Sequence, residues 1–151
     1  MSITRFDMET RLKAADPRTE DIFAIGDLWR QIGDNNIDAI THDPETLRSV
    51  MAGLDYLVLR DDSCRLIGAV SVLDCRQRLA KIDSLAVHPE HQGKRYGYEL
   101  ARSAVKHCVT HGYEQIITHA KPAAQKLFNS LGFETYEVNK TGNATMFLDL
   151  K

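Results

Sequence analysis

The sequence predicts a single α+β domain over residues 1–151, in which a mixed, mostly antiparallel twisted sheet carries helices on both faces. Apolar residues recur at helical spacing in four segments, and β-rich runs joined by short polar turns lie between them. Strands joined by short turns pair antiparallel, whereas two strands separated by a whole helix can pair in parallel. A chain of 151 residues is long enough to bury one core.

The N-terminal third predicts a short strand and two helices. The strand covers Arg11–Ala15, and the helices begin at Asp16-Pro17 and Asp43-Pro44, where a capping residue precedes a proline. The polar segment 34–42 connects the two helices at the surface. The inward-facing residues are expected to be Ile22, Ile25, Leu28, Trp29 and Ile32 in the first helix and Leu47, Val50, Met51 and Leu54 in the second.

The middle of the chain predicts three antiparallel strands followed by a long helix. The strands are Tyr56–Arg60, Leu66–Leu73 and Leu79–Val87, and the helix runs from about Arg95 to His111. Gly112 follows the helix as a left-handed cap. The helix presents a wide apolar stripe of Gly97, Leu100, Ala101, Ala104, Val105, Cys108 and Val109.

The C-terminal part predicts a strand, a helix and a closing hairpin. The strand Gln115–His119 can lie parallel to the strand ending at Val87, because a helix separates the two. Pro122 begins a helix that stops at Gly132. The runs Phe133–Val138 and Ala144–Leu150 form the hairpin.

Composition excludes several classes of function. The net charge of −2 gives no basic field for nucleic acid, and no run of 18 apolar residues predicts a membrane span. Three cysteines without metal-like spacing predict reduced thiols in a cytoplasmic protein. His107 and His111 lie one helical turn apart, which could hold a metal, but two solvated histidines near the helix end are the better interpretation, so no metal is expected.

The segment from Leu85 to Leu100 predicts an anion site. A buried strand is followed by a proline turn, a loop rich in glycine and basic residues, and the start of the long helix. The first turn of a helix leaves backbone N–H groups unpaired and carries partial positive charge. A phosphate or pyrophosphate can satisfy both.

Two motifs resemble those of the GNAT superfamily of acetyl-CoA-dependent N-acyltransferases. Gln92, Gly93, Lys94, Tyr96 and Gly97 fall in the frame of its Gln/Arg-x-x-Gly-x-Gly/Ala pattern. The segment from Ala124 to Phe133 looks like the later helix of that family, and the order of elements is similar over nearly the whole chain.

The resemblance implies acetyl-CoA as the acyl donor and no metal. Its pyrophosphate would lie on the N–H groups of residues 92–97, and its pantetheine arm would pair with the strand edge at Leu85, Ala86 and Val87. Arg95 stands where the family has a central glycine. Its Cβ could crowd the phosphate, or its guanidinium could bind a phosphate directly, and we expect that binding is retained.

The resemblance also implies catalytic positions. Asp83 matches the place of a carboxylate that takes the amine proton through water; the alternative is a solvated acid or an ion-pair partner. Phe128 and Lys121 stand where the family has a proton-donating tyrosine and an asparagine. His119 could replace the missing donor, because histidine titrates near neutral pH, or it could be structural. Tyr113 and Tyr136 are expected to be core or cap residues.

The function implied is an N-acetyltransferase that moves an acetyl group from acetyl-CoA to a primary amine of a small molecule or a protein. The alternative is a non-catalytic coenzyme A-binding regulatory module, because Arg95, Lys121 and Phe128 depart from the family pattern. A phosphate-binding domain for another nucleotide is a third reading. A homodimer is left open, since sheet edges and the hairpin offer pairing surfaces.

Overall fold

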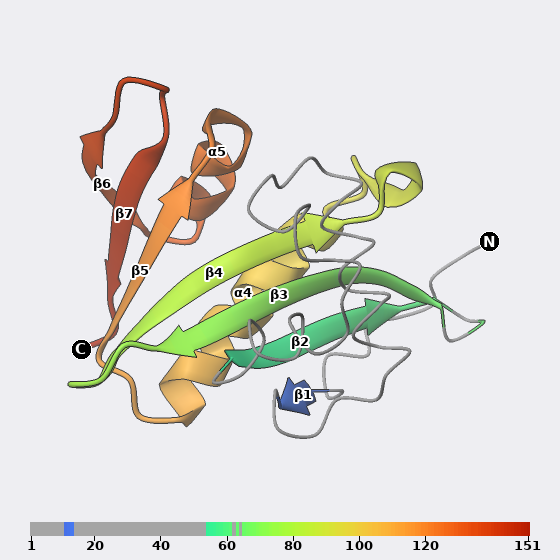
Figure 1. The fold of residues 1–151 in the computed structure, drawn as a ribbon, viewed down its shortest axis with the longest axis horizontal. Helices are drawn as coiled ribbons and strands as arrows, with labels where there is room; N and C mark the ends of the chain where they lie inside the picture. The colour runs from blue at the N-terminus through green and yellow to red at the C-terminus, as the bar shows by residue number, and fades with distance from the viewer. Residues whose placement is uncertain (1–10, 14–53, 62, 64) are drawn as a thin grey trace, which may run out of the picture.

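Seven strands form one sheet in the order β1-β2-β3-β4-β5-β7-β6 (Figure 1). The computed structural model describes residues 11–13, 54–61, 63 and 65–151. Neighbouring strands are antiparallel except β4 and β5, which are parallel, so the predicted mixed sheet is confirmed. The strands are β1 (Arg11–Lys13), β2 (Leu54–Arg60), β3 (Leu66–Asp74), β4 (Leu79–Val87), β5 (Gln115–Ala120), β6 (Glu134–Val138) and β7 (Ala144–Asp149).

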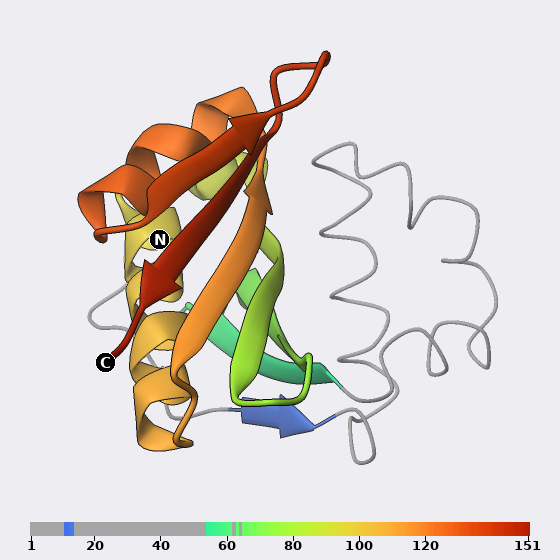
Figure 2. The ribbon, with the colours of Figure 1, turned by 90° about the vertical axis from the view of Figure 1, so that its left-hand side faces the viewer.

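Two α-helices cover one face of this sheet (Figure 2). Helix α4 (Tyr96–Thr110) packs on β2, β3 and β4, whereas α5 (Pro122–Ser130) packs on β5 and β7. A 3₁₀ helix, η1 (Pro89–His91), lies between β4 and α4. The helices predicted before β2 lie outside the described residues, except that Leu54 begins β2 and does not end a helix.

The core lies between the sheet and the two helices. Leu100, Ala104 and Cys108 of α4 are fully buried against it, as the predicted stripe requires. Val109 was predicted to join them but is 57% exposed, whereas His107 is buried and not solvated. Residue 107 lies three positions after the buried residue 104, so the buried stripe runs through 107 and 108 and leaves position 109 at its border.

Glycine at the end of α4 closes the helix as predicted. Gly112 has a φ of 80°, a left-handed conformation that costs glycine little. The N–H of Tyr113 donates to the carbonyl of Cys108 at 3.0 Å, and Tyr113 packs against the core. None of the helices in the described part of the chain is both long and apolar enough to span a bilayer.

Strands β4 and β5 pair for only part of their length. Their parallel ladder covers Leu79–Ile82 and 115–118, and then the strands diverge (Figure 1). The remaining backbone of β4, from Asp83 to Val87, pairs with β3 on one side and has no β5 partner on the other. The sheet is therefore split at the point where the anion-site loop begins.

Candidate functional site

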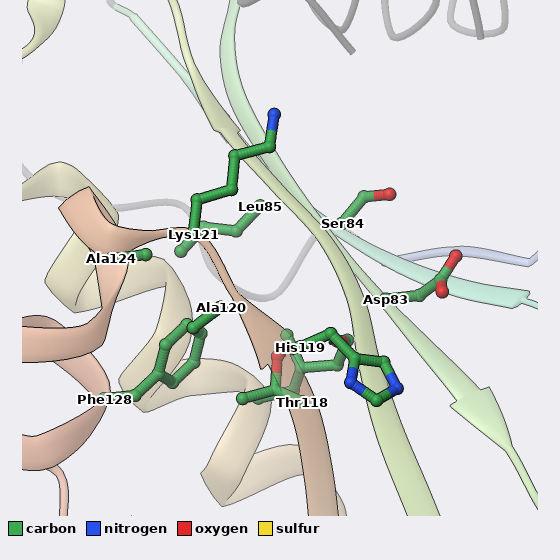
Figure 3. A pocket seen from close by; sticks show the side chains of 10 residues that line it. Asp83, Ser84, Leu85, Thr118, His119, Ala120, Lys121, Ala124 and Phe128 are labelled. Carbon is green, nitrogen blue, oxygen red and sulfur yellow. Dashed lines mark hydrogen bonds between the residues drawn. The ribbon is translucent and has the colours of Figure 1, made fainter. Parts of the chain in front are cut away.

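A small cavity of about 150 Å³ lies in the split between β4 and β5. Its walls come from both faces of the sheet: Figure 3 shows Asp83, Ser84 and His119 directed to one side and Phe128 to the other. The cavity is therefore lined by side chains from the helix-covered face and from the opposite face of the sheet. Its full lining is Ile82, Asp83, Ser84, Leu85, Thr118, His119, Ala120, Lys121, Ala124 and Phe128.

A β-bulge places Asp83 in the wall of this cavity. Ile82 pairs with Val72 and Ser84 pairs with Ser71, so Asp83 is an extra residue on β4. Before the bulge, Ile82 packs in the core under the helices; after it, Leu85 faces that core. Asp83 and Ser84 consequently share the opposite face, as Figure 3 shows. Bulges commonly re-aim side chains beside active sites.

The Asp83 side chain is 35% exposed and lies in a polar neighbourhood. Its Oδ1 is 3.2 Å from Nζ of Lys81, so the ion-pair alternative raised by the sequence is present together with the position in the cavity. Burial and the negative charge of Asp83 raise the pKa of the Tyr56 phenol, which therefore stays protonated. Tyr56 pairs with Ser71 of β3, and Ser71 pairs with Ser84 of β4, so a polar row leads across the sheet to the bulge.

His119 lies at the end of β5 in the same cavity. It is exposed, and its Nδ1 is 3.1 Å from the Thr145 hydroxyl of β7. Phe128 is only 2% exposed and packs edge-on against Phe133, so this wall of the cavity is apolar. Lys121 precedes α5 as its N-cap and makes no side-chain capping bond.

A larger groove of about 800 Å³ meets this cavity at Leu85 and Ala124, which line both. The groove lies between the β4–α4 loop and α5. Of the residues predicted to bind coenzyme A, it is lined by Leu85, Val87, Gln92, Gly93, Arg95, Tyr96 and Gly97. Lys121 and Phe128 line the smaller cavity, whereas Lys94 and Ala86 line neither, and the Ala86 side chain is buried.

The anion site at the head of α4 has the expected backbone. The N–H of Glu99 donates to the carbonyl of Arg95 at 3.1 Å, as in a helix whose cap is Arg95. The four preceding N–H groups, of residues 95–98, have no intrahelical acceptor. Gly93 has a φ of 81°, and a Cβ at Gly97 would enter the groove 3.5 Å from Leu127. These features fit a pyrophosphate held by backbone N–H groups.

Arg95 adopts a left-handed conformation with φ of 66°. This conformation favours glycine, which explains why the family pattern has glycine at the matching place. The guanidinium carbon lies 4.9 Å from the centre of the Tyr98 ring, a cation–π contact that holds the side chain along the groove. Arg95 and Tyr98 both line the groove.

Two loop side chains have structural roles that the sequence did not predict. Gln92 donates from Nε2 to the carbonyl of Val87 at 3.0 Å and so ties the loop to the end of β4. His91 is 5% exposed, and its Nδ1 has no partner within the described chain. Burial, and next the charge of Lys94, lower the pKa of His91. His88 is a turn residue, and its Nδ1 accepts the N–H of Glu90 at 3.2 Å.

The other histidine pair of the sequence lies elsewhere. His107 and His111 stack with ring centres 4.0 Å apart, and Nε2 of His107 lies 3.3 Å from Oδ2 of Asp55. Across the described part of the chain, no group of three or more His, Cys, Asp or Glu side chains is arranged to hold a metal ion.

Two residues of the site were not predicted from the sequence. Thr118 is buried at the point where β4 and β5 separate, and Ser84 shares the face of Asp83. The adjacent polar pair Asp83-Ser84 interrupts the alternation of Ala80, Lys81 and Ile82, and is the signal that could have predicted the bulge. Thr118 gives no such signal, because a threonine in a strand is ordinary.

Solved structures with the same fold are acetyltransferases. The PaiA N-acetyltransferase of Thermoplasma acidophilum, solved with coenzyme A, matches with a TM-score of 0.73 and 17% identity over 93% of this chain and 98% of that one. An aminoglycoside 6'-N-acetyltransferase solved with coenzyme A matches with a TM-score of 0.77 and 11% identity, over 94% of this chain and 96% of that one. The phosphinothricin acetyltransferase of Sinorhizobium meliloti, solved with acetyl-CoA, matches with a TM-score of 0.70 and 22% identity, over 93% of this chain and 88% of that one.

Sequence comparison assigns the family. No match was found among curated protein sequences. The profile of the Acetyltransferase (GNAT) domain family, however, matches residues 30–151, which include the split strands, the loop and both described α-helices. The chain therefore belongs to the GNAT acetyltransferase family.

Proposed function

We propose that the protein transfers an acetyl group from acetyl-CoA to a primary amine, with Asp83 and His119 as its catalytic residues. The observation that carries this proposal is the cavity in the split sheet. It shares Leu85 and Ala124 with the groove on the helix-covered face, and Asp83 and His119 line its other side. A donor on one face and an acceptor on the other can then meet at the split.

The groove supplies groups suited to each part of acetyl-CoA. The backbone N–H groups of residues 95–98 and the Arg95 guanidinium would hold the pyrophosphate. The pantetheine arm, which carries amide groups, would pair with the edge of β4 at residues 85–87 that β5 leaves free. The apolar wall of Leu85, Ala124 and Phe128 would exclude water from the thioester.

Transfer requires that one proton leaves the amine and another reaches the sulfur. Asp83 accepts a proton from the amine through water, so that the nitrogen lone pair can attack the thioester carbonyl. The N–C bond forms as the C–S bond breaks. His119, on the same side of the cavity, donates a proton to the departing thiolate, because Phe128 has none to give.

The class of acceptor, the cellular compartment and the oligomeric state form part of the same proposal. The acceptor is a small molecule or a protein with a primary amine, and the protein acts in the cytoplasm. Within the described residues Cys75 and Cys108 are free thiols, which suits a reducing compartment. A homodimer formed through the exposed edge strand β6 would be compatible with the sheet order.

A non-catalytic coenzyme A-binding module is the second candidate. It is favoured by Phe128, whose buried ring stands at the place of the family's proton-donating tyrosine. Such a module would use the same groove and would leave Asp83 in its ion pair with Lys81.

An acyl-transfer screen separates the two candidates. Purified protein with acetyl-CoA and a panel of amines would be assayed by mass spectrometry, beside the variants Asp83→Asn and His119→Asn, with coenzyme A affinity measured by calorimetry. Acetylated amine from the wild type, and much less from both variants at unchanged coenzyme A affinity, is expected. Tight coenzyme A binding without transfer to any amine would favour the module.

A further inference from the structure

The sheet face opposite α4 and α5 carries a hollow that the proposed reaction does not use. It lies over β5, β6 and β7 and has a volume of about 380 Å³. Two aromatic rings and one carboxylate dominate its walls. Its lining residues are Gln115, Glu134, Thr135, Tyr136 and Phe147.

A second bulge directs Tyr136 into this hollow. Thr135 pairs with Met146 and Glu137 pairs with Thr145, so Tyr136 is an extra residue on β6. Its ring meets Phe147 edge to face with centres 5.8 Å apart, yet 74% of Tyr136 remains exposed. The sequence predicted a core or cap residue here, and the structure contradicts it. The ring therefore offers a face to a ligand.

The charge of this surface selects the class of ligand. The described strands β5, β6 and β7 contain three acidic residues, Glu134, Glu137 and Asp149, and no lysine or arginine. Aromatic faces attract ammonium groups, and a carboxylate beside them adds an ion-pair partner. An alkylammonium ion can both contact the aromatic faces and form an ion pair with the carboxylate.

The hollow lies on the same sheet face as the proposed catalytic side chains. His119 pairs with Thr145, and two residues further along each strand Ile117 pairs with Phe147. At ~3.3 Å per residue, the hollow begins ~7 Å from His119 and extends to ~13 Å at Gln115. A linear molecule lying along β5 and β7 can therefore reach both places.

We propose that this hollow binds a second ammonium group of the acceptor, and that the acceptor is a linear diamine or polyamine. The inference rests on the proposed function, since one amine must lie at Asp83 while the other occupies the hollow. Glu134 supplies the counter-charge, and Tyr136 and Phe147 supply the aromatic walls. Their positions select the length of the acceptor.

The kinetic test uses three acceptors: 1,8-diaminooctane, 8-amino-1-octanol of the same length with one amine, and 1,2-diaminoethane, which is too short. We expect the lowest KM for 1,8-diaminooctane. Glu134→Gln and Tyr136→Leu should each raise that KM by about two- to fivefold, the range of one exposed cation–π contact. The KM for 8-amino-1-octanol and the kcat should not change.

Glu137→Gln is the matched control, because it makes the same change on the same strand outside the hollow. An equal rise in KM from Glu137→Gln would overturn the site, since the effect would then come from general charge. Equal KM values for the diamine and the amino alcohol in the wild type would also overturn it.

Calorimetry without acetyl-CoA separates this proposal from the proposed function. We expect wild-type protein to bind 1,8-diaminooctane more tightly than Glu134→Gln or Tyr136→Leu protein, even if no acetyl transfer is detected. Equal affinities for all three proteins would overturn the hollow as an ammonium site, whether or not transfer occurs.

Discussion

The hydroxyl of Thr118 donates a hydrogen bond to the carbonyl oxygen of Ile82 at 3.0 Å, at the last pair of the parallel β4–β5 ladder. Beyond this pair the two strands separate and the cavity lined by Asp83 and His119 begins. The bond is buried and joins strands whose paired residues lie 36 positions apart. It fixes the point at which the sheet opens.

Loss of this bond should destabilise the fold. Thr118→Val keeps the shape of the side chain but removes the donor from a buried carbonyl. We expect the free energy of unfolding to fall by ~1–3 kcal/mol, the cost of leaving such a group unsatisfied. Urea denaturation measures it. Thr118→Ser keeps the hydroxyl and lacks the methyl group, so it should lose less; an equal or larger loss in Thr118→Ser would show that the hydrogen bond is not the main source of stability at this position.

Neutralising Asp83 should slow catalysis without weakening donor binding. Asp83→Asn removes the proton acceptor, so kcat should fall by ~10²–10⁴-fold, the usual contribution of a general base. The affinity for coenzyme A, measured by calorimetry, should stay the same because Asp83 does not line the groove. Ser84→Ala, on the same face, is the control. A similar fall in kcat in Ser84→Ala would show that any change on this surface slows the reaction, and that the effect is not specific to the carboxylate.

Two substitutions at Arg95 separate its charge from its backbone. Arg95→Ala and Arg95→Gly both remove the guanidinium, so both should weaken coenzyme A binding by about tenfold, as for one charged hydrogen bond. Because φ is 66°, glycine should also be ~1 kcal/mol more stable than alanine there. Calorimetry and thermal denaturation report the two effects. Unchanged affinity in Arg95→Ala would rule out a phosphate contact.

A hydroxyl at position 128 should supply a second proton donor. Phe128→Tyr extends a side chain that already lines the cavity, so its hydroxyl has space to enter. We expect kcat to rise, and His119→Asn to become less harmful in this background, because the two donors are alternatives. Steady-state kinetics of the four proteins form a double-mutant cycle. Strict additivity of the two changes would argue against His119 as the donor.

The stability of the protein should fall in mild acid through His91. Burial lowers the pKa of His91 in the folded state, so the unfolded chain binds the proton more readily. The stabilisation is therefore present above the unfolded pKa of ~6.5 and is lost as the pH falls toward the lower folded value. His91→Gln should lose less free energy of unfolding between pH 7.5 and 5.5 than the wild type. Parallel curves would assign the acid sensitivity to other groups.

Much of the C-terminal fold follows from local patterns in the sequence. The bounds of α4, α5 and β5 agree with prediction to within a residue or two, because capping residues, prolines and glycines mark them directly. Predicted strand bounds and the parallel β4–β5 pair are equally close. These features depend on neighbouring residues and on the length of the connection between strands.

The candidate site was only partly predictable, because it depends on contacts between distant strands. The bulge at Asp83 arises from the pairing of β4 with β3, and the exposure of Tyr136 arises from the pairing of β6 with β7. Gln92 was expected to offer its backbone N–H to the phosphate, and the bond of its side chain to the Val87 carbonyl was not predicted. The pattern of a single sequence shows which residues are polar, but it does not determine the register in which two strands pair.

The extra residue in β4 divides the strand into two halves with opposite substitution rules. Up to Ile82 the even-numbered positions accept only apolar side chains, and from Leu85 onward the odd-numbered positions do. Removing one residue at 83 would restore a regular strand, with Ile82 and Leu85 still facing the core and Ser84 alone on the opposite face between them. A deletion at this position would therefore remove the carboxylate from the cavity wall and leave the core packing of the strand unchanged.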